Sequence, residues 1–209
     1  YAAKVAKRYS GSTPSWIRER WHTPDGDFVD VDWRADETTL KEHAPLLVMF
    51  HGLEGSSSSH YAQAFAYETQ QRGWRMAIPH FRGCSGEINW TPRAYHSGDY
   101  EEIGWILNRM RDQHQGPMFA VGISLGGNAL MRWAGEMGNA AHQLVDGIAS
   151  VCSPIDLTAS GNAIDSGFNK AIYARMFLAT MKPRAMQKLR QFPGLFDPQE
   201  LQAAETLYA

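Results

Sequence analysis

Short apolar runs alternate with amphipathic segments through the middle of the chain. The apolar runs are 45–50, 74–79, 118–123 and 145–152, and the amphipathic segments are 61–71, 99–113 and 128–137. Amphipathic segments repeat apolar residues every three or four positions, as Ile103, Ile106 and Met110 do, which is typical of a half-buried helix. Continuous apolar runs of this length are typical of strands buried on both faces. The alternation predicts a mostly parallel, doubly wound α/β sheet, in which 145–152 is another buried strand.

The pattern differs on either side of this region. Residues 17–23 and 28–33 alternate apolar and polar positions around an Asp25-Gly26 turn, which predicts an antiparallel hairpin. Late in the chain only helical patterns remain. We expect 1–157 to form the N-terminal part of a core and 158–209 to form a helical cap, with the remainder of the core beyond this chain.

Composition narrows the class of protein without changing the predicted fold. The 209 residues carry a net charge of −2, with 20% charged residues, which indicates neither a nucleic-acid surface nor a polybasic membrane patch. Apolar stretches are too short to span a membrane, and the two cysteines do not make a disulfide framework. Phosphate-loop and metal-ligand motifs are not found. We expect a cytoplasmic protein that uses neither a metal nor a cofactor; its oligomeric state is not indicated.

One pentapeptide carries candidate chemistry. Gly122-Ile123-Ser124-Leu125-Gly126 lies between a predicted strand and a predicted helix. A serine hydroxyl attacks poorly unless it is held exposed beside a base, and a sharp strand-to-helix turn with glycines two residues to either side exposes it. We therefore predict that Ser124 is a nucleophile in a strained turn. The backbone N–H of Leu125 is the predicted first donor to an oxyanion.

Four motifs, taken together, give the chain a family resemblance. They are Pro24-Asp25-Gly26-Asp27-Phe28, His51-Gly52-Leu53-Glu54-Gly55, Tyr95-His96-Ser97-Gly98 and Ser124-Leu125-Gly126-Gly127-Asn128. In their order and approximate spacing the chain resembles the α/β-hydrolases, and within them the YheT-like subfamily. The resemblance implies an α/β-hydrolase fold and a serine esterase or lipase, with some acyltransferase activity, acting on short- and medium-chain acyl groups. It also implies two further strands after the cap, carrying the Asp and His of a catalytic triad beyond residue 209.

The histidines are distributed as that implication requires. In the α/β-hydrolase order the base follows the nucleophile, yet of eight histidines only His142 follows Ser124, in a predicted helix-to-strand connection. We predict that no histidine of this chain both contacts Ser124 and is oriented by a carboxylate. His51 is interpreted as orienting its own loop, His60 has no acid arranged beside it, and His96 belongs to a helix start.

A second oxyanion donor is predicted in the loop after the first parallel strand. The resemblance favours the N–H of Leu53, which follows His51-Gly52, and the N–H of Glu54 is the alternative. Asp156 lies where a minority of α/β-hydrolases place the triad acid, but the resemblance places that acid outside this chain. Cys84 is expected to be a small buried residue rather than a nucleophile.

The cap is expected to cover the Ser124 cleft with apolar side chains. Its first long helix is apolar on nearly every side, with Met176, Phe177, Leu178 and Met181. We favour burial of this helix against the core; the alternative is that it lines an acyl pocket. We expect Pro183, Pro193 and Pro198 to separate the helices of the cap. Asp165 and Asp197 are interpreted as surface charges.

These expectations combine into a functional hypothesis. The leading one is a serine hydrolase that cleaves carboxylic esters through an acyl-enzyme, with Ser124 as nucleophile and Leu53 and Leu125 as oxyanion donors. The partner is a small-molecule or lipid-like ester. An acyltransferase or thioesterase could use the same groups, and a hydrolase-like binding scaffold without catalysis is the alternative from another class.

Overall fold

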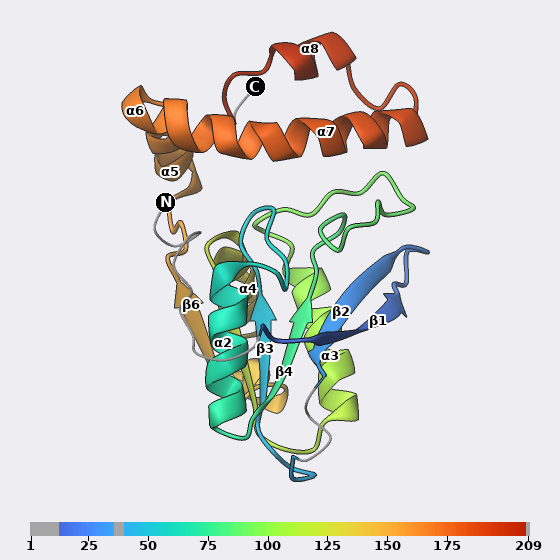
Figure 1. Ribbon diagram of the computed structural model, residues 1–209, viewed down its shortest axis with the longest axis vertical. Coiled ribbons are helices and arrows are strands. Elements are labelled where there is room, and N and C mark those ends of the chain that lie inside the picture. Colours follow the sequence, from blue (N-terminus) through green and yellow to red (C-terminus); the bar gives the residue numbers. More distant parts are fainter. Residues whose placement is uncertain (1–12, 36–39, 208–209) are drawn as a thin grey trace.

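A six-stranded mixed sheet forms the centre of the computed structural model, which describes residues 13–35 and 40–207 (Figure 1). The strands are β1 (Trp16–His22), β2 (Phe28–Arg34), β3 (Leu46–Phe50), β4 (Arg75–Pro79), β5 (Met118–Ile123) and β6 (Gly147–Val151). They lie in the order β1-β2-β4-β3-β5-β6. β1, β2 and β4 are antiparallel neighbours, whereas β4, β3, β5 and β6 run parallel. The predicted hairpin and the mostly parallel sheet are confirmed.

Helices cover both faces of this sheet. α2 (His60–Gln71) packs on one face, and α3 (Tyr100–Gln113) and α4 (Leu125–Met137) pack on the other. α4 begins three residues before the predicted start at 128, because its first turn contains two glycines that carry no apolar periodicity. A 3-10 turn (Gly138–Gln143) then leads into β6. The doubly wound arrangement is therefore confirmed.

The sheet separates two apolar cores because successive residues of a strand face opposite sides. In β3, Leu46, Val48 and Phe50 contribute to the core beneath α3 and α4, while Leu47 and Met49 contribute to the core beneath α2. All five side chains are buried. The residues that follow β3 consequently leave a rigid strand at the carboxyl edge of the parallel sheet, where α/β proteins usually bind ligands.

β6 differs from the prediction of a buried strand. Four of its five residues are exposed, including Ile148 and Val151. The reason is its position: within the described residues β6 pairs with β5 alone and forms an edge of the sheet. Apolar residues of the segments that follow are also exposed, among them Ile155 at 98% and Phe168 of the short helix Gly167–Asn169 at 79%. This side of the molecule therefore has an uncovered apolar surface.

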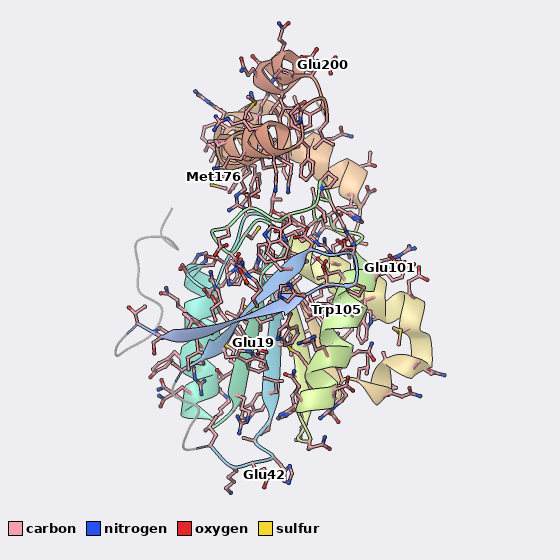
Figure 2. The ribbon with its side chains drawn as sticks, turned by 90° about the vertical axis from the view of Figure 1, so that its right-hand side faces the viewer. Glu19, Glu42, Glu101, Trp105, Met176 and Glu200 are labelled. Atoms are coloured by element: carbon pink, nitrogen blue, oxygen red, sulfur yellow. The ribbon has the colours of Figure 1, made fainter. Side chains whose placement is uncertain are left out.

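The helices after β6, which we call the cap, lie over the carboxyl edge of the sheet. They are α5 (Leu157–Ile164), α6 (Gly167–Asn169), the π-helical turn η3 (Lys170–Ala174), α7 (Arg175–Gln191) and α8 (Pro198–Ala203). Figure 1 shows α7 crossing above the loops that follow β3 and β4, with α8 on its outer side. Figure 2 shows the same separation from another side, with Met176 and Glu200 in the cap and Trp105 in the core below.

Two expectations about the cap are wrong. α7 has no buried residue, so it is not packed against the core as an apolar helix. Its neighbours are the loops at the sheet edge rather than the apolar face of the sheet (Figure 1), so the helix is not buried against the core. Pro183 lies inside α7 instead of ending a helix, although Pro198 does begin α8. A proline removes only one helical hydrogen bond, and α7 continues on both sides of it.

The remaining parts of the predicted regions, 1–12, 36–39 and 208–209, lie outside the described residues. Among the described residues, no helix combines the length and the apolar character that crossing a membrane requires.

Candidate active site

Ser124 occupies the turn between β5 and α4. Its backbone has φ 51° and ψ −116°, in the left-handed half of conformational space that disfavours residues with a Cβ. The strain is held in place by two hydrogen bonds: the Ser124 N–H donates to the Val151 carbonyl at 2.8 Å, and its carbonyl accepts from the Asn128 N–H at 3.0 Å. Such strain costs on the order of 1–3 kcal/mol and persists only where the surroundings fix it. This is the sharp turn predicted from the pentapeptide.

The glycines around Ser124 are required by close backbone contacts. A Cβ at Gly122 would lie 2.4 Å from the Cα of Gly127, and a Cβ at Gly126 would lie 2.4 Å from the carbonyl oxygens of Phe50 and His51. Contacts this short are not tolerated between backbone atoms. Strand β5 and helix α4 can therefore pass each other, and approach the end of β3, only because these positions lack side chains.

The turn of residues 52–55 lies beside the serine. A Cβ added to Gly52 would be 3.4 Å from the Ser124 Cβ, so the two backbones are neighbours. The turn is closed by the Gly55 N–H, which donates to the Gly52 carbonyl at 2.9 Å. Its third residue, Glu54, has φ 58°, a second strained position within the site.

The backbone amides of the 52–55 turn are used unequally. The Gly52 N–H donates to the Tyr61 hydroxyl at 3.0 Å, and the Glu54 N–H donates to the Tyr95 hydroxyl at 3.0 Å. The Gly55 N–H is engaged within the turn. Among the described residues no acceptor is found for the Leu53 N–H, and the same holds for the Leu125 N–H in the first turn of α4. An unengaged amide at a helix N-terminus favours a negative charge nearby.

His51 is buried and holds the start of this turn. Its Nδ1 is 2.8 Å from the Gly52 carbonyl, and its Nε2 accepts a hydrogen bond from the Phe81 N–H at 3.1 Å. These partners assign the proton to Nδ1 and leave neither nitrogen available to a nucleophile. Burial lowers the pKa of His51 to about 3, so the ring is neutral. The interpretation of His51 as a residue that orients its loop is confirmed.

A histidine–carboxylate pair exists elsewhere at the sheet edge. His80 Nε2 lies 2.8 Å from Asp32 Oδ2, and both side chains are buried. Within the described part of the chain, no hydrogen bond joins this pair to Ser124. His60 and His142 are exposed. The described residues therefore hold no histidine that contacts the Ser124 hydroxyl and is oriented by an acid, in line with the prediction from chain order.

The acids considered as alternatives have structural partners. Asp156 is exposed and caps α5, where its Oδ1 accepts from the Ala159 N–H at 2.8 Å. Asp197 caps α8 in the same way. Asp165 is half-buried and accepts the Leu207 N–H with both oxygens at 2.9 Å, so it ties down the end of the cap rather than being a free surface charge. His96 Nδ1 accepts from the Gly98 N–H just before α3.

One cluster that sequence reasoning did not find links the cap to the 52–55 turn. The Tyr95 hydroxyl donates to Glu54 Oε1 at 2.9 Å, and Arg184 of α7 forms an ion pair with the same carboxylate. The Arg184 Nη1 also lies 3.0 Å from the Cys84 sulfur. Burial raises the pKa of the Cys84 thiol, which fits a structural cysteine. Glu54 and Tyr95 belong to two of the four motifs that carry the family resemblance, those of residues 51–55 and 95–98. Their joint presence in the sequence was the only sign that these residues meet.

A cavity of about 550 Å³ lies between the cap and the loops after β3 and β4. Leu178, Met181 and Phe196 form part of its cap side, and Leu53 and Glu54 part of its core side. We predicted that the cap would cover the Ser124 cleft. Ser124 is not among the lining residues, however, and the cavity reaches only the 52–55 turn beside it. The cavity lies away from Ser124 because α7 crosses above the loops after β3 and β4 (Figure 1).

No group of three or more potential metal-ligating side chains occurs among the described residues.

Comparison with known proteins places this geometry in a family. Residues 45–200 match the model of the alpha/beta hydrolase fold family. The chain is 41% identical to the Escherichia coli protein named "Putative esterase YheT" over 91% of this chain and 55% of that protein. It is 31% identical to a Saccharomyces cerevisiae protein named "Medium-chain fatty acid ethyl ester synthase/esterase 2" over 56% of this chain and 26% of that one. The matched segments thus span about half the length of the first relative and about a quarter of the second.

A solved structure supports the fold independently of sequence. The Pyrococcus furiosus esterase Pf2001 superimposes with a TM-score of 0.55 over 85% of this chain and 67% of the other, at 16% identity. Identity this low is informative about the architecture alone.

Proposed function

The chain belongs to the α/β-hydrolase family and is similar to YheT, and on that premise we propose that it is a serine hydrolase that cleaves carboxylic esters of short- to medium-chain acyl groups. In this proposal the Ser124 oxygen attacks the ester carbonyl, and the alcohol leaves after it takes up a proton. Water then attacks the acyl-enzyme and releases the acid. The substrate is a small or lipid-like ester, and the location is cytoplasmic.

The main support for this proposal is a strained serine that lies near two backbone N–H groups without a hydrogen-bond acceptor. Ser124 is held at positive φ beside Gly52, and the N–H groups of Leu53 and Leu125 have no acceptor among the described residues. Preorganised donors of this kind stabilise the tetrahedral oxyanion, and removing one typically lowers kcat by about 10²–10³-fold. The alternative donor, the Glu54 N–H, is already bonded to Tyr95. Leu53 and Leu125 are therefore the proposed oxyanion donors.

A histidine oriented by an aspartate, both outside residues 1–209, is the proposed base. Support comes from the three buried histidines of the described residues. His51 has both nitrogens engaged, His80 contacts Asp32 but not Ser124, and His114 contacts the Pro117 carbonyl at 3.2 Å. Without a base, the oxyanion donors and binding leave roughly 10³–10⁴-fold over water. Full Ser124-dependent turnover by residues 1–209 alone would place a base inside this chain.

An acyltransferase is the second candidate, favoured by the name of the yeast relative, which combines synthase and esterase. In that reaction an alcohol, not water, accepts the acyl group from the same Ser124 ester. Adding ethanol to the assay separates the two, because an acyltransferase converts p-nitrophenyl butyrate to ethyl butyrate in preference to butyrate. A thioesterase would prefer an acyl thioester over the matched oxygen ester.

The test of the proposed function is the turnover of p-nitrophenyl esters by the natural full-length protein. We expect the butyrate and octanoate esters to react faster than a charged succinate ester, because most of the lining of the cavity that reaches the 52–55 turn is apolar. Ser124→Ala should lower kcat by about 10³-fold or more, whereas Ser166→Ala, at an exposed cap serine, should not. Absence of turnover on every ester would favour the binding scaffold.

A further inference from the structure

Glu54 bonds to one tyrosine through both its backbone and its side chain. The Glu54 N–H donates to the Tyr95 hydroxyl at 3.0 Å, and that hydroxyl donates its own proton to Glu54 Oε1 at 2.9 Å. The hydroxyl thus fixes the peptide unit that directly follows Leu53. Because Glu54 is at φ 58°, this peptide unit would relax to another orientation if the bonds were lost.

The carboxylate of Glu54 depends on the cap for its charge partner. Its side chain is only 9% exposed, and Oε2 has no hydrogen bond among the described residues. Arg184 supplies the compensating charge, with Nε 3.2 Å from Oε2 and Nη1 3.2 Å from Oε1. A buried carboxylate without a partner is costly, so loss of the arginine would drive Glu54 toward solvent and away from Tyr95.

The cluster also lies at the wall of the cap cavity. Leu53, Glu54, Tyr95 and Arg184 all line it, so the cap arginine and the turn border the same cavity. A simple anchor between cap and core would not need to meet the turn at its strained residue. The amide next to that residue is the proposed oxyanion donor.

We propose that Arg184, Glu54 and Tyr95 are positioning residues for the oxyanion amide of Leu53, so that the seating of the cap sets the catalytic geometry. The proposal rests on the esterase function proposed above. Arg184 neutralises Glu54, and Glu54 and Tyr95 lock the Leu53–Glu54 peptide. The Leu53 N–H belongs to the adjacent Gly52–Leu53 peptide, whose carbonyl accepts from the Gly55 N–H at 2.9 Å. In this proposal the locked peptide holds the other side of Leu53, and so keeps the Leu53 N–H directed to the site beside Ser124. None of the three is proposed to touch the reacting atoms.

The test compares Arg184→Gln and Tyr95→Phe with the control Arg190→Gln, which alters an exposed arginine of the same helix. Each is made in the natural full-length protein, and kcat and KM are measured with p-nitrophenyl butyrate. The inhibition constant of a trifluoromethyl ketone, which forms a tetrahedral oxyanion with the serine, is measured in parallel. We expect kcat to fall about tenfold or more in both variants, with KM within about threefold, and the inhibition constant to rise by the same factor as kcat falls.

Two further readouts separate positioning from anchoring. Arg184→Lys, which keeps the charge, should restore part of kcat. The double variant should lose little more than the worse single variant, because both act through one peptide unit. A rise in KM alone, or kcat and inhibitor binding within twofold of the wild type, would show that Arg184 only anchors the cap.

Failure of the proposed function gives a different result. In that case the wild-type protein itself shows no Ser124-dependent turnover, and the positioning proposal is overturned with it. Arg184 is 37% exposed in its side chain, so Arg184→Gln is expected to fold even if Tyr95→Phe does not. The thermal midpoint of each variant is measured to establish this, and Arg184→Gln then decides the proposal alone.

Discussion

Ser124 and Glu54 are non-glycine residues held at positive φ on facing loops of the same site. Strain of this kind is retained where a precise side-chain or amide position matters more than stability. For Ser124 the strain displays the hydroxyl at the end of β5. For Glu54 it sets the peptide unit after Leu53. A trade between stability and function is therefore expected at each position.

The cost in stability of the strained Ser124 backbone can be measured directly. Glycine adopts φ 51° without steric cost, so Ser124→Gly should raise the free energy of unfolding by about 1 kcal/mol while abolishing esterase turnover. Ser166→Gly is the matched control, because Ser166 is exposed at φ −118° and gains nothing from glycine. Urea unfolding measures both. A loss of stability in Ser124→Gly would mean that the serine backbone is not strained.

His51 predicts a specific dependence of stability on pH. Its pKa is about 3 in the folded protein because of burial, against the ordinary value of 6.5 for an exposed ring. Between these values the unfolded state binds one more proton than the native state, so the free energy of unfolding falls as pH falls through this window. The slope from this single group is at most about 1.4 kcal/mol per pH unit.

The measurement is urea unfolding from pH 6 to 4.5. His51→Gln should have a shallower pH slope than the wild type by about one proton, whatever its absolute stability. His60→Gln replaces an exposed histidine and should keep the wild-type slope. Equal slopes in all three proteins would show that His51 titrates normally and is not buried as a neutral ring.

At the residue scale, the sequence predicts what is local. The strained serine and its neighbouring N–H follow from five adjacent residues. The cluster of Glu54, Tyr95 and Arg184 does not, because its members are 41 and 130 positions apart and no periodicity connects them. The role of His51 in orienting its loop could be predicted from the sequence, because a histidine directly after a fully buried strand has backbone groups as its nearest partners.

At the scale of elements, glycine decides how closely α4 passes the sheet. A Cβ at Gly126 would lie 2.4 Å from two backbone oxygens, which cannot move without displacing β3, so Gly126→Ala should destabilise the fold by about 3 kcal/mol or more. A Cβ added at Gly135, in the same helix, would meet no atom within 4 Å. Gly135→Ala should therefore stabilise by about 0.5–1 kcal/mol through helix propensity.

Thermal or urea unfolding of the two alanine variants should give opposite signs. The same sign in both would mean that helix propensity, and not the close approach to β3, controls stability at these sites. The elements themselves were predictable because apolar periodicity reports burial on one or two faces. The same periodicity gave a wrong prediction for β6. Its apolar sequence predicts burial, but among the described residues it pairs with β5 alone and most of its residues are exposed.

At the scale of the whole molecule, the cap is attached by polar bridges. α7 has no buried residue, so its position over the sheet edge depends on a few contacts to the core. One is the ion pair of Arg184 with Glu54. Another is Lys188, whose Nζ donates to the carbonyls of Asn89 at 2.7 Å and Thr91 at 2.6 Å. Sequence periodicity could not show this, because it reports apolar contacts and predicted an apolar docking helix instead.

The attachment predicts how the cap opens. Lys188→Met keeps the length of the side chain but removes its donors, and hydrogen bonds that involve a charge contribute about 1.5–3 kcal/mol each. We expect amide hydrogen exchange in α7 to quicken by about tenfold or more, while exchange in α3 is unchanged, because only the cap opening becomes easier. Lys182→Met is the matched control on the same helix, since Lys182 donates to the Gln202 carbonyl within the cap. Unchanged exchange in α7 of Lys188→Met would show that the cap is held by contacts other than these bridges, and the coupling of cap seating to the 52–55 turn would then rest on Arg184 alone.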